Sequence, residues 1–69
     1  MLIRTQNMNG IIDAVHVYCS GKKVYGSTSK SESSSILLGN YQSNEEAIQA
    51  IDKLENWLSN GTKGVFRMS

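Results

Sequence analysis

The clearest pattern along the chain lies between residues 43 and 61, where apolar residues recur every three or four positions. The members of this repeat are Ala47, Ala50, Ile51, Leu54, Trp57 and Leu58. Such spacing places the apolar side chains along one stripe of an α-helix and the polar ones opposite. Ser43 and Glu46 have the spacing of a capping box, and Gly61 stands where helices commonly end. We therefore predict one amphipathic helix over 43–60.

Shorter stretches elsewhere alternate between apolar and polar positions or are rich in β-branched and aromatic residues, as strands are. They are residues 1–6, 11–19, 23–26, 36–38 and 64–68. The dipeptide Asn9-Gly10 and the tripeptide Ser20-Gly21-Lys22 predict tight turns between the first three of them, because these residues adopt turn conformations readily. Residues 27–35 hold six serines and little apolar surface, so they are expected to form a loop.

Strict alternation along 11–19 predicts two faces for this strand. We expect Val15, Val17 and Cys19 to face the helix, and Ala14, His16 and Tyr18 to face away from it. The predicted core then contains Leu54 and Trp57 packed against residues from the strands, with Phe66 at one end. These strand residues are Ile3, Val15, Val17 and Leu38.

The predicted element order is β-β-β-β-α-β, and all of 1–69 forms a single small domain. This order indicates an α+β fold, in which one helix packs on one face of a mostly antiparallel sheet of about five strands. We favour the spatial order 4-3-2-1-5, with the last strand antiparallel beside the first. A right-handed parallel crossover that places the last strand beside the fourth is the alternative.

Composition removes several classes of protein from consideration. Seven Lys and Arg against six Asp and Glu give a net charge of +1, without the basic excess typical of nucleic-acid binders. The single cysteine, Cys19, excludes an intramolecular disulfide. Apolar runs are too short to span a membrane, and the first residues lack the apolar region of a signal peptide. We therefore expect a cytoplasmic protein with no membrane association.

The few chemically reactive residues do not combine into a site. His16 and Cys19 are three residues apart, an odd offset that puts their side chains on opposite faces of a regular strand. The same argument separates Asp13 from His16, and nothing in the sequence presents Ser20 as a nucleophile. We therefore predict no catalytic residues, no metal ligands and no cofactor, and hence no enzyme.

Several stretches of the chain resemble a group of short proteins of Firmicutes bacteria and of their phages and mobile elements. They are Ile3-Arg4-Thr5-Gln6, Leu38-Gly39-x-Tyr41-x-Ser43-x-Glu45-Glu46-Ala47, Leu54 and Val65-Phe66-x-Met68. The serine-rich segment 27–35 departs from the group's pattern. The group has no assigned activity, so the resemblance implies a bacterial or phage setting and transfers no functional residue.

These observations favour a small accessory protein that acts by binding another macromolecule. One helix can cover only one face of the sheet, and the uncovered face is predicted to carry apolar and aromatic side chains. The predicted interaction face consists of Ile12, His16, Tyr18 and Tyr25. Exposed apolar patches of this kind often mark interfaces, so we expect a homodimer formed through this face or through the edge of the fourth strand. The alternative is a module that binds single-stranded nucleic acid through the same face, using its rings and nearby lysines.

Overall fold

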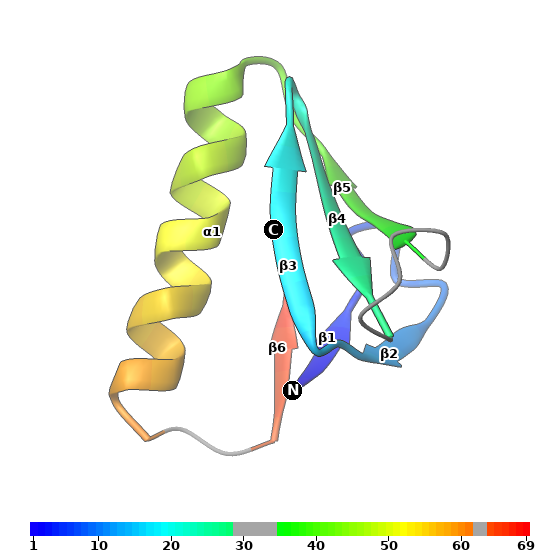
Figure 1. Ribbon diagram of the computed structural model, residues 1–69, viewed down its shortest axis with the longest axis vertical. Coiled ribbons are helices and arrows are strands. Elements are labelled where there is room, and N and C mark those ends of the chain that lie inside the picture. The colour runs from blue at the N-terminus through cyan, green and yellow to red at the C-terminus, as the bar shows by residue number, and fades with distance from the viewer. Residues whose placement is uncertain (29–34, 62–63) are drawn as a thin grey trace.

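The computed structural model describes residues 1–28, 35–61 and 64–69, and these ranges contain six strands and one helix (Figure 1). The elements are β1 (Leu2–Arg4), β2 (Ile11–Asp13), β3 (His16–Ser20), β4 (Lys23–Ser27), β5 (Ser35–Asn40), α1 (Asn44–Ser59) and β6 (Val65–Arg67). The α+β class is as predicted, but the single five-stranded sheet is not. The strands form two sheets of three, ordered β2-β1-β6 and β3-β4-β5. Residues 29–34 of the serine-rich segment lie outside the described residues.

The predicted strand 11–19 breaks because the chain passes from one sheet to the other between Ala14 and His16. The amide of Ala14 donates to the carbonyl of Met1 in the first sheet, and the amide of Val15 donates to the carbonyl of Ser27 in the second, both at 2.8 Å. Ser27 is also the ladder partner of His16, so two consecutive residues oppose one. This arrangement is a β-bulge, and it bends the strand.

The bulge shifts the alternation of side chains by one residue. Ala14, predicted to face away from the core, is 1% exposed, whereas Val15, predicted to face the helix, is 59% exposed. Beyond the bulge the predicted pattern holds, because Val17 and Cys19 pack against the core and His16 is exposed. The prediction was wrong for Ile12, which also packs against the core, as well as for Ala14 and Val15, because it assumed one unbroken strand.

The last strand lies beside the first, as favoured, but runs in the other direction. Leu2, Ile3 and Arg4 pair with Val65, Phe66 and Arg67 in a parallel ladder, where an antiparallel one was predicted. The antiparallel prediction assumed that all strands alternate in direction within one sheet, whereas the strands form two sheets. Because the chain bends between β2 and β3 and then passes through α1, β6 comes to lie beside β1 and runs in the same direction as β1 (Figure 1).

A second link between the two sheets lies at the edge of β5. The amide of Gln6 donates to the carbonyl of Leu38 at 2.7 Å, and its side-chain oxygen accepts from the amide of Asn40 at 2.8 Å. This edge, predicted to offer unpaired backbone groups, is therefore partly covered.

The tight turn predicted at Ser20-Gly21-Lys22 is present, whereas the turn predicted at Asn9-Gly10 forms earlier, where the amide of Met8 donates to the carbonyl of Thr5 at 2.9 Å. Gly21 has a φ of +62° in the turn between β3 and β4, where a two-residue hairpin requires positive φ. In the turn between β1 and β2 the amide of Thr5 donates to the carbonyl of Gly10 at 2.9 Å. The residue with positive φ there is Met8, at +66°, and not Asn9 or Gly10.

The helix begins as predicted. The hydroxyl of Ser43 accepts from the amide of Glu46 at 3.2 Å, and the Glu46 carboxylate accepts from the amide of Gln42 at 3.1 Å. The carboxylate thus reaches one residue further back than in the usual capping box. Helix α1 packs against β3 and β4. Within the described ranges, no helix is both long and apolar enough to cross a membrane.

The core lies between the helix and the two sheets. Its buried apolar members are Ile3, Ala14, Val24, Leu38, Ala47, Ala50, Leu54 and Met68. Leu54 is buried as predicted, but Trp57 is only half-buried and meets Phe66 edge to face at a centroid distance of 5.6 Å. Trp57 therefore closes one margin of the core and does not fill its centre.

Candidate interaction surfaces

Three of the four residues predicted to form an interaction face lie together on the outer side of β3 and β4. Tyr18 and Tyr25 are ladder partners whose rings stack at a centroid distance of 5.6 Å and an angle of 25°. His16 follows on the same side of β3, with its ring 5.4 Å from that of Tyr18. The hydroxyls of Tyr18 and Ser35 are hydrogen-bonded at 2.8 Å. We call His16, Tyr18 and Tyr25 the ring row.

Ile12, the fourth predicted member, does not join the ring row. It belongs to β2 in the other sheet and packs against the core, beside Gly26. The bulge explains this separation, because residues an even number apart lie on one face only when the strand between them is regular.

Leu37, which was not among the predicted residues, extends the ring row. Leu37 is the ladder partner of Tyr25 and is 46% exposed. A register irregularity near Val24 and Tyr25 determines this pairing, so no local sequence signal marks which side of β5 Leu37 occupies. Lys23 lies two residues before Tyr25 on β4 and therefore on the same face.

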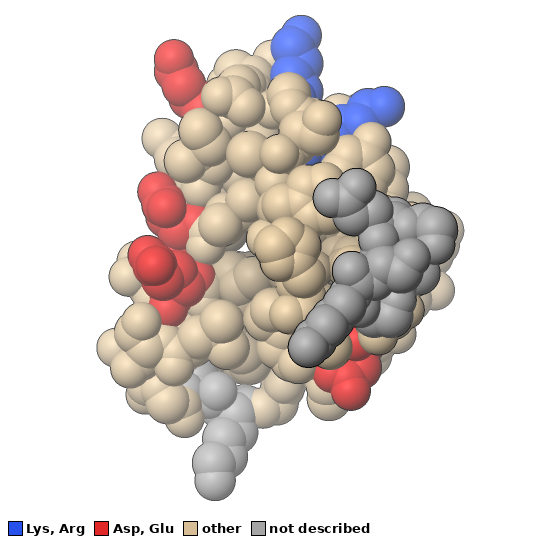
Figure 2. All heavy atoms as spheres, viewed as in Figure 1, with Lys and Arg blue, Asp and Glu red and all other residues tan. Residues whose placement is uncertain are grey.

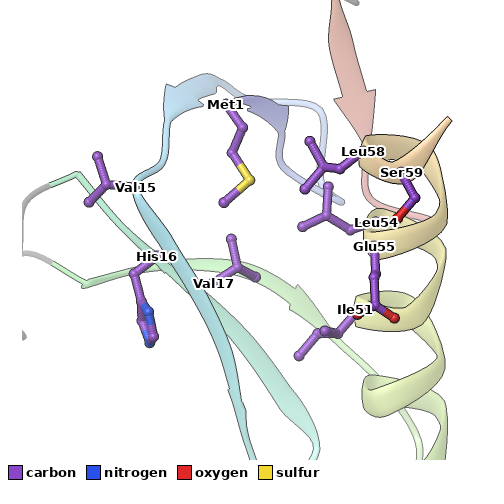
Figure 3. A pocket seen from close by; sticks show the side chains of 9 residues that line it. All are labelled: Met1, Val15, His16, Val17, Ile51, Leu54, Glu55, Leu58 and Ser59. Atoms are coloured by element: carbon purple, nitrogen blue, oxygen red, sulfur yellow. The ribbon is translucent and has the colours of Figure 1, made fainter. Parts of the chain in front are cut away.

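A hollow of about 330 Å³ separates the start of β3 from the second half of α1 (Figure 3). Its lining residues are Met1, Val15, His16, Val17, Ile51, Leu54, Glu55, Leu58 and Ser59. Among the lining residues, Leu54 is buried, whereas Val15 and Leu58 are exposed. We call this feature the β3–α1 hollow.

A smaller hollow of about 200 Å³ lies on another side of α1, between Tyr41 and Lys53. The Tyr41 hydroxyl oxygen is buried and has no hydrogen-bond partner among the described residues. Burial raises the pKa of the Tyr41 phenol above its ordinary value of 10.0, because desolvation disfavours the phenolate. The phenol is thus held neutral, which suits a packing role.

Charge is unevenly distributed over the surface. Helix α1 carries four acidic residues (Glu45, Glu46, Asp52 and Glu55) and one lysine, Lys53, so its side chains sum to −3. Figure 2 shows acidic side chains along the α1 side of the molecule and basic ones at the end where β3 turns into β4. Lys22 and Lys23 belong to that turn and the strand that follows it.

The reactive residues are placed apart, as the alternation predicts. His16 is exposed on the outer face, whereas Cys19 packs against the core. In the described part of the chain, no three His, Cys, Asp or Glu side chains gather as metal ligands would. Among the described residues, the ring row and the β3–α1 hollow are two surfaces that a partner could use. No family model, no curated protein and no solved structure matches this chain.

Proposed function

We propose that this chain is a small non-catalytic interaction protein that binds another macromolecule through the ring row, and that a second copy of the chain is one such partner. The observation that carries the proposal is the contiguity of three rings with the exposed side chain of Leu37 on one sheet face. Helix α1 packs elsewhere, against the core, and does not cover this face. From the resemblance alone, we also propose a bacterial or phage cytoplasmic setting.

Aromatic side chains make this face suitable for a protein contact. Tyrosine buries a large apolar ring while its hydroxyl keeps a polar partner, and such residues are enriched at interfaces. Tyr18 and Tyr25 already support each other through stacking, so little side-chain freedom remains to be lost on binding. A twofold dimer is the commonest way to cover such a patch in a small protein.

Sedimentation equilibrium at tens of micromolar tests the dimer. The chain has a mass of 7.6 kDa, and we expect about twice that mass for the wild type and the single-chain mass for Tyr18→Glu. Ile11→Glu is the control, since Ile11 is exposed on the other sheet and the substitution should leave the dimer intact. A wild-type mass of 7.6 kDa throughout the range would refute self-association.

Single-stranded nucleic acid is the second candidate partner, favoured by one observation. Lys23 lies on the same face as the ring row, so a cation and stackable rings occur together. Two features weigh against it: the rings of Tyr18 and Tyr25 stack on each other, and α1 is acidic.

Fluorescence anisotropy with labelled twelve-nucleotide DNA and RNA, at low and at physiological salt, separates this candidate from the first. Binding that weakens with salt and is lost in Tyr25→Ala and Lys23→Gln would support it. Absence of binding at low salt would eliminate it.

A further inference from the structure

On the side away from β4, strand β3 has no strand partner among the described residues, and its start lines the β3–α1 hollow. It is an outer strand of its sheet and pairs only with β4 within the described ranges. Ser20 and Lys23 flank the two-residue turn, so they form a hydrogen-bonded pair, and such pairs alternate along an antiparallel ladder. The backbone groups of Val17 and Cys19 therefore point away from β4. They offer the donors and acceptors that an added strand would use.

The hollow adjoining this edge is of a size and polarity that suit an apolar side chain. Its volume of about 330 Å³ is roughly twice that of a cavity that holds benzene in a protein interior. Val17 from β3 and Ile51 and Leu54 from α1 point into it (Figure 3). The exposed side chains of Val15 and Leu58 extend this apolar surface outward.

The helix side of the hollow is acidic. Glu55 lines the hollow, and no ion pair involves it in the part of the chain that the structure describes. Asp52 is three residues earlier and lies on the same side of the helix. The one lysine of the helix, Lys53, lines the other hollow and so does not neutralise this side. An occupant with a positive charge would match this wall.

We propose that an extended peptide segment of a partner protein adds to β3 as a further strand, places an apolar side chain in the β3–α1 hollow, and sets a lysine or arginine against Glu55. Main-chain hydrogen bonds to the β3 edge would supply affinity, and the hollow and its acidic wall would supply selectivity. His16 borders both this site and the ring row, but Tyr18 and Tyr25 do not line the hollow, and the proposal does not depend on the dimer proposed above.

A second copy of the chain fits this edge less well than a basic peptide does. Pairing two β3 edges about a twofold axis would bring two α1 helices, each with side chains summing to −3, close to the same junction. Like charges that face each other across an interface are unfavourable. The acidic side chains of α1 therefore favour a basic partner over a second copy of the chain.

The test is selection of a displayed library of random nine-residue peptides on the immobilised chain, followed by affinity measurement on the enriched peptides. We expect enriched peptides with β-branched residues, a central apolar residue and a flanking lysine or arginine. We also expect binding to slow hydrogen exchange at the amides of Val17 and Cys19 in NMR spectra. Enrichment of peptides without these features, no enrichment at all, or unchanged exchange at both amides would overturn the proposal.

Matched variants assign the contacts. Glu55→Gln should weaken binding about two- to five-fold, as for a surface ion pair, whereas Glu45→Gln, the same charge change in the first turn of α1, should not. Cys19→Pro removes an amide that β4 does not use, and should weaken binding about ten-fold or more. Equal effects of the two Glu variants would refute the contact with Glu55. Tyr25→Glu alters the ring row from β4, one strand away from the β3 edge, and should bind the peptides like the wild type, so loss of the dimer and loss of peptide binding are separate results.

Discussion

Replacing Gly26 by alanine tests the packing between β4 and its neighbours. Gly26 lies in the interior of β4, and its backbone does not have positive φ, so alanine meets no backbone strain there. A Cβ at this position would stand 3.0 Å from the Cδ1 atoms of both Ile12 and Leu38. Carbon atoms in favourable contact are about 3.5 to 4.0 Å apart. The added methyl group therefore has to displace two core side chains.

The expected magnitude follows from two opposing effects. Overpacking a core costs about 1 to 3 kcal/mol. Replacing glycine by alanine restricts the unfolded chain and returns about 0.4 to 1 kcal/mol. We expect Gly26→Ala to lower the free energy of unfolding by about 1 to 2 kcal/mol, which for a domain of this size lowers the melting temperature by about 4 to 16 °C.

Urea and thermal unfolding followed by circular dichroism measure this loss. Gly10→Ala is the matched control, because nothing lies within 4 Å of a Cβ there and its φ is not positive. Only the unfolded-state effect remains at Gly10, so that variant should be as stable as the wild type or slightly more so.

A double mutant tests whether the close contact between the new Cβ and the side chain of Ile12 causes the loss of stability. Ile12→Val removes the Cδ1 atom that the new Cβ would meet, so it should cost less in the Gly26→Ala background than in the wild type. Equal stability of the two alanine variants, or additive effects in the double mutant, would refute this account of the packing.

Three further predictions concern single side chains. Tyr41→Phe should leave the free energy of unfolding at pH 7 unchanged or raise it by up to about 1 kcal/mol, because it removes a buried hydroxyl without a partner among the described residues. Because burial raises the pKa of Tyr41, the stability that its neutral phenol contributes is fully present below the ordinary pKa of 10.0 and is lost as the pH rises through the folded-state pKa. The free energy of unfolding should therefore fall less steeply at alkaline pH in Tyr41→Phe than in the wild type. Met8→Asn should raise the free energy of unfolding in urea by about 0.5 to 1 kcal/mol, because asparagine tolerates the left-handed φ of +66°, whereas Met8→Val should lower it. Trp57→Ala should cost about 2 kcal/mol by circular dichroism, less than the 3 to 5 kcal/mol typical of a fully buried tryptophan, because Trp57 is half-buried against Phe66.

The candidate site was partly predictable because a regular strand carries its own geometry. His16 and Tyr18 are two residues apart within β3, and alternation alone places them on one face. The hairpin turn at Gly21 then brings Tyr25 opposite Tyr18. Leu37 and the β3–α1 hollow were not predictable in this way, because both depend on contacts between segments far apart in the sequence.

The sequence by itself determined the elements whose causes are local. The apolar stripe and the Ser43 cap specify α1, since their partners lie within a few residues. Turn residues such as Gly21 specify the β3–β4 hairpin for the same reason.

Tertiary structure alone decided where the long strand bends, which way the last strand runs and which turn residue adopts positive φ. At the bulge, the amide of Ala14 donates to the carbonyl of Met1 and the amide of Val15 donates to the carbonyl of Ser27. Neighbouring amides therefore take partners in different sheets. The strand propensities of residues 11–19 do not indicate where the chain leaves one sheet for the other, because β-branched residues are found in straight and in bent strands alike. The bend then buries Ala14, exposes Val15 and lets β6 run parallel to β1, three outcomes of one non-local choice of hydrogen-bond partners.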